Sequence, residues 1–166
     1  INNETIGLFV DVIDDARGYV NAVLQPLFDL GEQIVPVSSL DELDVDAFGG
    51  GIVVTDKVMS DHHKHLLRTS LLYRPPTFVI GMGCKKGVPQ AELGDALATA
   101  LAELGLARSS AAALTTVDLK ADEPGLIKLA EQMELPLTIV SSKDLQALPV
   151  GEFTPSAAQE KLALPG

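Results

Sequence analysis

Short apolar runs alternate with longer amphipathic segments along the whole chain. The apolar runs are rich in β-branched residues and predict buried strands, whereas apolar residues that recur every three or four positions predict helices. The expected strands are residues 6–12, 34–37, 52–55, 77–80, 111–117 and 136–140. The expected helices run from Asp14-Asp15 to Leu30 and over residues 61–72, 89–104, 124–133 and 143–147, with another from Pro155 and a short helix or loop over 40–48.

Helical periodicity also predicts which side chains face inward. In the first long helix these are Val20, Val23, Leu24 and Leu27, and in the helix over 89–104 they are Leu93, Leu97, Ala100, Leu101 and Leu104. A turn is expected at Gly49-Gly50-Gly51. Strands that alternate with helices are typical of parallel sheets. The sequence therefore predicts a three-layer α/β fold, with a mostly parallel sheet flanked by helices and two successive halves that contain βαβ units.

The double proline in Arg74-Pro75-Pro76 divides these two halves. It predicts a domain boundary, with one domain over residues 1–76 and a second over 77–166. The same prolines could instead lie in a loop within a single sheet.

A glycine-rich loop lies between the strand at 77–80 and the helix that follows Pro89. A strand, a glycine loop and a helix N-terminus present free backbone N–H groups and the positive end of a helix dipole, which favour an anion. The spacing Gly-x-Gly-x-x-x-Gly matches neither the dinucleotide fingerprint nor the phosphate loop. The predicted substrate-binding residues are Gly81, Gly83, Cys84, Lys85, Lys86 and Gly87. Alternatively, the glycines only permit a tight turn.

A second polar loop, residues 118–123, follows the strand at 111–117. Ligands of parallel α/β sheets gather at the carboxyl ends of the strands, so the two loops are expected to meet over one crevice. The acid–base candidates in this loop are Asp118, Lys120, Asp122 and Glu123. Alternatively, Asp122 and Glu123 only complement the dipole of the next helix, and Lys120 is a solvated charge.

The net charge of −11 and the isoelectric point near 4.5 argue against nucleic-acid binding. No apolar run is long enough to span a membrane, and no secretory signal opens the sequence, so we expect a cytoplasmic protein. A single cysteine excludes an internal disulfide and a multi-cysteine zinc site. This residue, Cys84, could be a nucleophile activated by the helix N-terminus and two lysines, although a small buried side chain is the favoured interpretation.

All three histidines lie in Asp61-His62-His63-Lys64-His65. His62 and His65 are one helical turn apart, which is a spacing compatible with a metal site. A third ligand would have to come from Asp56 or Asp61. A polar helix face explains the same residues, so no metal ligand is assigned.

Three motifs resemble the CobE/CbiG C-terminal family of cobalamin biosynthesis, in the family's order and spacing across residues 77–166. They are Ile80-Gly81-Met82-Gly83-Cys84-Lys85-Lys86-Gly87, Asp118-Leu119-Lys120-Ala121-Asp122-Glu123-Pro124-Gly125-Leu126 and Pro155-Ser156-Ala157-Ala158. Residues 6–76 look like the central region of longer CbiG proteins.

The resemblance implies a cobalt-precorrin-5A hydrolase, or part of one, which opens the δ-lactone of its substrate and releases acetaldehyde. The cobalt would be carried within the substrate, and no further cofactor is expected. The alternative is a non-catalytic CobE-like module that binds or carries corrinoid intermediates. The Gly-His-x-Gly-Gly-Ala-Asn and Thr-Thr-Ala-Thr-Asp motifs of full-length CbiG proteins do not occur in this sequence. A larger or fused protein, and contacts with other enzymes of the pathway, are therefore expected.

Overall fold

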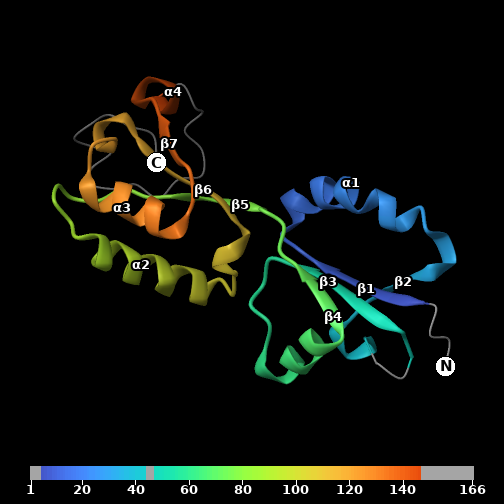
Figure 1. Ribbon diagram of the computed structural model, residues 1–166. Coiled ribbons are helices and arrows are strands. Elements are labelled where there is room, and N and C mark those ends of the chain that lie inside the picture. The colour runs from blue at the N-terminus through green and yellow to red at the C-terminus, as the bar shows by residue number, and fades with distance from the viewer. Residues whose placement is uncertain (1–4, 44–46, 147–166) are drawn as a thin grey trace. The chain divides into compact units, whose positions relative to one another are not determined.

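The computed structural model describes residues 5–43 and 47–146. These residues form two compact units (Figure 1). The first unit takes its residues from 1–78 and 100–111, and the second from 79–99 and 112–166. Each unit contains one β-sheet with helices in the connections between its strands. The predicted α/β fold of mostly parallel strands flanked by helices is confirmed, with the strands divided between two sheets.

The sheet of the first unit has four parallel strands in the order β2-β1-β3-β4. The strands are β1 (Ile6–Asp11), β2 (Ile34–Val37), β3 (Gly50–Thr55) and β4 (Ser70–Tyr73). Between them lie α1 (Arg17–Phe28) and the short 3₁₀ helices η1 (Asp14–Ala16), η2 (Gly31–Gln33), η3 (Leu40–Glu42) and η4 (Asp61–Arg68). The chain leads from β1 to the edge strand β2 and from β3 to the opposite edge strand β4. The strand order therefore reverses between β1 and β3.

Apolar side chains cover both faces of this sheet. On one face, Leu8 and Val54 pack with Val20 and Leu24 of α1. On the other face, Val53 packs in a cluster that is completed by Leu43, Met59 and Leu66. Helical segments therefore lie on both sides of the sheet, which gives this unit three layers (Figure 1).

The second unit follows the order β5-β6-β7 in both space and sequence. The elements along this part of the chain are β5 (Phe78–Gly81), α2 (Gln90–Glu103), η5 (Arg108–Ser110), β6 (Ala111–Val117), η6 (Asp118–Lys120), α3 (Pro124–Met133), β7 (Leu137–Val140) and α4 (Ser142–Gln146). Of these, η5 and the last residues of α2 belong to the first unit. β6 and β7 pair in parallel. Successive right-handed crossovers in one direction place their helices on the same face of a sheet. Accordingly, a Cβ built on Gly94 of α2 would lie 3.8 Å from Leu129 Cδ1 of α3.

Four expectations about elements need correction. The helix predicted over 61–72 ends at Arg68, and Ser70–Tyr73 forms β4 instead. Gly50 and Gly51 are the first residues of β3, so the predicted turn is shorter than expected. Val23 and Leu104 are exposed rather than inward-facing, at 42% and 66%. Ala100, which was also expected to face inward, is exposed. The helix expected from Pro155 lies outside the described residues.

A buried carboxylate fills the end of the first sheet at the point where the strand order reverses. Asp56, which follows β3, is fully buried. Its Oδ2 accepts hydrogen bonds from the backbone N–H of Ile13 (2.9 Å) and the hydroxyl of Thr77 (2.8 Å). In open α/β sheets this crevice is the usual place for a ligand. Here a side chain of the protein occupies it, and the carboxylate joins the end of β1 to the segment that leads into β5.

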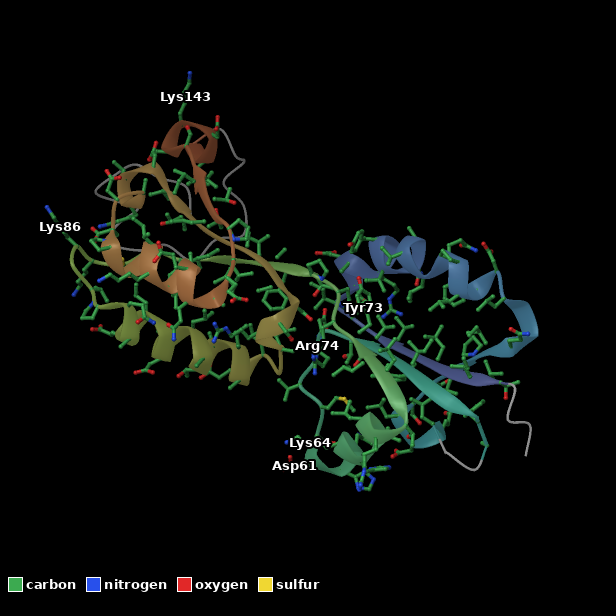
Figure 2. The ribbon with its side chains drawn as sticks, viewed as in Figure 1. Asp61, Lys64, Tyr73, Arg74, Lys86 and Lys143 are labelled. Carbon is green, nitrogen blue, oxygen red and sulfur yellow. The ribbon has the colours of Figure 1, made fainter. Side chains whose placement is uncertain are left out.

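Arg74 secures the same region within the first unit. Its guanidinium donates to the carbonyl oxygens of Thr55, at 3.2 Å, and Lys57. Figure 2 shows this side chain close to Tyr73 at the end of β4. Burial lowers the pKa of Arg74, and the nearby Asp56 carboxylate opposes this change.

Within the described residues, no helix is long and apolar enough to cross a membrane.

Candidate functional site

The two loops that the sequence predicts to meet are in contact in the second unit. The glycine loop follows β5, and the polar loop follows β6. The backbone N–H of Gly87 donates to Glu123 Oε2 at 2.9 Å, across 36 positions of sequence. At the start of the glycine loop, the N–H of Met82 also donates to the carbonyl oxygen of Thr115 in β6, at 2.9 Å. The loops therefore form one edge at the ends of adjacent strands, as expected.

Glu123 is the residue that holds these loops together. Its side chain is largely buried, and its second oxygen, Oε1, lies 3.3 Å from Lys120 Nζ. The hydrogen bond from Gly87 is the main reason that the pKa of Glu123 lies below its ordinary value, and Lys120 and Lys86 act in the same direction. A carboxylate with a lowered pKa is ionised at neutral pH and is a weak base. Glu123 therefore acts as a clamp on the glycine loop.

Asp118 connects the same edge to β7. Its carboxylate accepts hydrogen bonds from the hydroxyl of Ser142 and from the backbone N–H groups of Ser142 (3.0 Å) and Leu119 (2.8 Å). The Ser142 hydroxyl is the main cause of a lowered pKa for Asp118. Ser142 begins α4, immediately after the end of β7. Asp118 therefore fixes the position of the third strand end relative to the polar loop.

Asp122 differs from the other two acids of this loop, Asp118 and Glu123. It is exposed, and among the described residues it has no hydrogen-bond or ion-pair partner. Of the four predicted acid–base residues, Asp118 is bonded to Ser142, and Lys120 and Glu123 are paired with each other, whereas Asp122 is available to a ligand. The geometry thus distinguishes the residues that stabilise the loops from Asp122, the candidate for acid–base chemistry. The sequence alone could not make this distinction.

A cavity of about 430 Å³ opens where the first turns of α2 and α3 lie side by side. Lys128 is one of the residues that line it; the others are Gly87, Val88, Pro89, Gln90, Ala91, Pro124 and Gly125. Two helix N-termini and a lysine make this cavity electropositive, which favours an anionic group.

Gly125 makes this close approach of the helices possible. A Cβ at this position would lie 2.2 Å from the carbonyl oxygen of Val88 and 3.2 Å from Leu93 Cδ1. Real Cβ atoms do not approach backbone oxygen so closely, so any larger residue would push α3 away from the glycine loop. The wall of the cavity therefore depends on the absence of a side chain.

The remaining loop residues lie on the rim of this edge. Gly81, Gly83, Lys85 and Lys86 are exposed, and Lys86 extends away from the ribbon (Figure 2). Cys84 is half-buried. Burial and the Glu123 carboxylate raise the pKa of the Cys84 thiol, while Lys120 opposes them. A raised pKa disfavours the thiolate, so the geometry does not favour a nucleophilic Cys84.

Sequence reasoning missed Lys128 and Gly125 as parts of the site. Lys128 lies one turn after Pro124, the first residue of α3, so its spacing from the proline was the available signal. For Gly125 no sequence signal was available, because only the structure shows the carbonyl oxygen that it approaches.

The histidines of η4 are placed differently from expectation. Asp56 is buried and accepts hydrogen bonds from Ile13 and Thr77, and Asp61 is paired with Lys64. Neither residue joins the histidines as a third ligand. Asp41 of η3 lies next to them instead.

Comparison with known proteins identifies similarities over the second half of the chain. The family described as Cobalamin synthesis G C-terminus matches residues 78–166. A protein named cobalt-precorrin-5A hydrolase, from Priestia megaterium, is 33% identical over 99 residues, which are 60% of this chain. The chain spans only 26% of the length of that relative.

One solved structure is also similar. It is the crystal structure of CobE, a protein from the cobalamin (vitamin B12) biosynthetic pathway. The match has a TM-score of 0.49 and 30% sequence identity, and it covers 53% of this chain and 63% of that chain.

Proposed function

This chain belongs to the cobalamin synthesis G C-terminal family, whose match extends over residues 78–166, and we propose that it forms the substrate-binding part of a cobalt-precorrin-5A hydrolase. In this proposal the cobalt-containing precorrin binds over the edge where the loops after β5 and β6 meet. The name of the curated relative supports this substrate.

The observation that carries the proposal is the hydrogen bond from Gly87 to Glu123. It joins the glycine loop to the polar loop, and these are two of the three motifs on which the family resemblance rests. Residues that are 36 positions apart thus form one continuous surface. A shared surface is expected when both motifs serve the same ligand.

The charges on this surface suit a substrate with many peripheral carboxylates. The chain as a whole carries a net charge of −11, which would repel such a molecule. Lys85, Lys86 and Lys128 supply positive charge at the loop edge, together with the N-termini of α2 and α3. The cavity of about 430 Å³ is large enough for one carboxylate side chain of the substrate, while the ring itself would lie on the exposed rim.

Asp122 is the best-placed acid for lactone hydrolysis in this proposal. As a general base it would accept a proton from water while the water oxygen attacks the lactone carbonyl carbon. The resulting oxyanion would be stabilised by loop N–H groups and a lysine, and the carbon–oxygen bond of the lactone would then break, with protonation of the departing alkoxide. The exposed position of Asp122 requires the substrate, or a part of the protein outside the described residues, to exclude bulk water.

The alternative function is a CobE-like binding module that changes nothing in its ligand. One observation favours it: both Glu123 and Asp118 are engaged in hydrogen bonds that hold loops. The two functions share the binding surface and differ only in whether Asp122 acts on the ligand. A cytoplasmic location and contacts with other enzymes of the pathway stay predictions under both.

The test is incubation of the full chain with enzymatically prepared cobalt-precorrin-5A, with the corrinoid absorbance and trapped acetaldehyde both measured. Acetaldehyde release that is lost in Asp122→Asn would support the hydrolase. A saturable spectral change without acetaldehyde would favour the binding module. Absence of any spectral change at substrate concentrations near 1 mM would reject the proposed site.

A charge-reversal pair locates the surface. Lys85→Glu with Lys86→Glu should weaken corrinoid binding at least tenfold, since two attractive charges become repulsive ones. Lys64→Glu is the matched control because Lys64 is also an exposed lysine but belongs to η4 of the first unit. Equal losses in both variants would indicate a nonspecific charge effect and would contradict the placement.

A further inference from the structure

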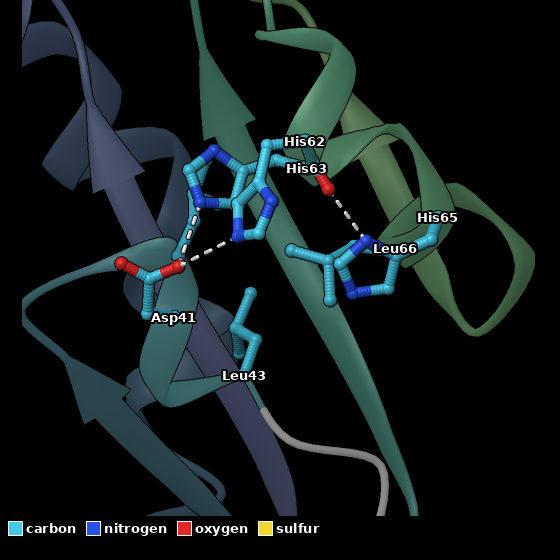
Figure 3. Close-up of a pocket in the computed structure, with 7 residues that line it drawn as sticks. Asp41, Leu43, His62, His63, His65 and Leu66 are labelled. Atoms are coloured by element: carbon cyan, nitrogen blue, oxygen red, sulfur yellow. Dashed lines mark hydrogen bonds and ion pairs between the residues drawn. The ribbon is translucent and has the colours of Figure 1, made fainter.

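Two histidines and one aspartate from separate segments meet on the surface of the first unit. His62 and His63 belong to η4, and Asp41 belongs to η3, about twenty residues earlier. One possible ligand atom from each of these residues lies within 4.8 Å of the other two. Figure 3 shows both imidazole rings directed toward the same carboxylate. Two imidazoles and a carboxylate are a common ligand set for late first-row divalent metals.

The distances match those between two ligands of one ion. Metal–nitrogen and metal–oxygen bonds of about 2.0–2.2 Å place neighbouring ligand atoms about 3 Å apart in octahedral geometry and about 3.3–3.6 Å apart in tetrahedral geometry. His63 Nε2 lies 2.9 Å from Asp41 Oδ1, and His62 Nε2 lies 3.7 Å from the same oxygen. The His62 side chain is 78% exposed, so little packing holds its ring in place.

His63 is already held in the orientation that a ligand needs. Its side chain is 22% exposed, and Nδ1 lies 3.0 Å from the Ser60 hydroxyl. This hydroxyl can donate to Nδ1 when Nε2–H is bonded to Asp41. It can equally accept from Nδ1–H when Nε2 binds a metal. Such a second partner fixes ring orientation and tautomer in metal sites.

The surroundings form a cavity with an apolar floor. Its volume is about 330 Å³, and Leu43 and Leu66, both nearly fully buried, lie beneath the polar residues together with Leu40. The apolar floor shields the inner side of the site, where His63 lies, while His62 and Asp41 face solvent with 78% and 72% of their side chains exposed. A purely solvated helix face would not bring a carboxylate from another segment over such a floor.

His65 lies beside the cluster but is oriented elsewhere. Its Nδ1 is 2.7 Å from the carbonyl oxygen of His62, to which it donates (Figure 3). Its ring centroid is 6.2 Å from that of His62. This arrangement makes His65 a natural control, because it has the same chemistry and the same helix without the contact to Asp41.

From this geometry we propose that Asp41, His62 and His63 form a binding site for a late first-row divalent metal ion such as Zn²⁺. The site belongs to the first unit and is independent of the proposed corrinoid surface. Among the described residues, three possible ligand atoms converge there, so the remaining coordination positions are left for water or a further ligand.

The test is calorimetric titration of the metal-free full chain with Zn²⁺, with Co²⁺ absorbance as a report on coordination by nitrogen and oxygen. Wild type should bind one Zn²⁺ per chain. His63→Ala and Asp41→Asn should each weaken binding at least tenfold, and circular dichroism should confirm that both variants are folded. His65→Ala and Asp61→Asn, the matched controls, should change the affinity less than threefold.

Three outcomes would overturn the proposal. The first is no saturable Zn²⁺ binding up to 1 mM. The second is unchanged affinity in Asp41→Asn with a loss in His65→Ala, which would assign the metal to the His62 and His65 pair. The third is an equal loss in all four variants. None of these outcomes bears on corrinoid binding by the second unit.

Discussion

In both units a carboxylate near the end of a strand holds a distant loop, but the two carboxylates are buried to different degrees. In each, a carboxylate that follows a central strand accepts a backbone N–H from a distant loop: Asp56 from Ile13, and Glu123 from Gly87. Asp56 is fully buried and connects the end of β3 to the segment that follows β1. Glu123 lies next to an open cavity and exposed lysines. The same kind of hydrogen bond therefore stabilises a buried strand end in the first unit and the border of an open cavity in the second.

The neighbours of each carboxylate explain the difference. Asp56 has Lys57 Nζ 3.5 Å away and the Thr77 hydroxyl as a second donor, so its charge is compensated inside the first unit. Glu123 has Lys120 for the same purpose, while Lys85, Lys86 and Lys128 lie nearby with exposed ammonium groups. The exposed lysines beside Glu123 supply positive charge on the surface, which is what an anionic ligand needs.

The largest effect is expected from Asp56→Ala. It leaves the partly buried N–H of Ile13 and the hydroxyl of Thr77 without an acceptor, and we expect a loss of about 3 kcal/mol in the free energy of unfolding. Urea denaturation followed by circular dichroism measures it. Asp61→Ala, which removes an exposed acid from η4, should cost less than about 0.5 kcal/mol. Similar losses in the two variants would show that burial does not distinguish Asp56.

A smaller effect is expected from Gly125→Ala. The added Cβ meets the carbonyl oxygen of Val88, so α3 must shift, at a cost of about 2 kcal/mol, and corrinoid binding should weaken with it. Gly94→Ala is the matched control in α2, because its Cβ would have ordinary contacts at 3.7 and 3.8 Å. Alanine should stabilise that helix by about 0.5–1 kcal/mol. Destabilisation by both substitutions would mean that the helix pair tolerates no added volume anywhere.

The smallest effect is expected from Glu123→Gln, measured as a function of pH. The pKa of Glu123 is lowered in the folded state, so its contribution is present above the ordinary value near 4.5 and is lost as pH falls through the lowered pKa. Urea midpoints between pH 7 and pH 3 should therefore fall less steeply in this variant than in wild type.

Glu131→Gln removes one exposed acid from α3, the helix that Glu123 precedes, without touching the glycine loop and serves as the control. If it flattened the pH dependence as much as Glu123→Gln, the bond to Gly87 would not be the cause.

The sheet and the contact between the two loops could be predicted because both follow from local patterns. Apolar runs identify strands, and parallel strands bring their carboxyl ends to one edge. The strand at Ser70–Tyr73 was missed because Leu66, Leu71 and Leu72 continue the apolar spacing of the preceding helical segment without a glycine or proline between them.

Residue roles were harder to predict than elements. The contact between Asp41 and His63 depends on how η3 and η4 pack on the same face of the sheet, and no local pattern encodes that distance. The same holds for Asp122, whose availability becomes visible only once the partners of Asp118 and Glu123 are known. The roles of individual acids therefore required three-dimensional contacts.

The first unit is built from two separate stretches of the chain, and this has a consequence for its synthesis on the ribosome. Its residues 100–111 come after the first strand of the second sheet, and they donate the N–H of Ala107 to the carbonyl oxygen of Asp56 at 2.7 Å. The N–H of Val58 likewise bonds to the carbonyl oxygen of Gly105, at 2.8 Å. At about 5–20 residues per second, the nascent chain makes Asp56 roughly 3–10 seconds before it makes Ala107. During that interval the end of the first sheet lacks the backbone partners that residues 100–111 provide.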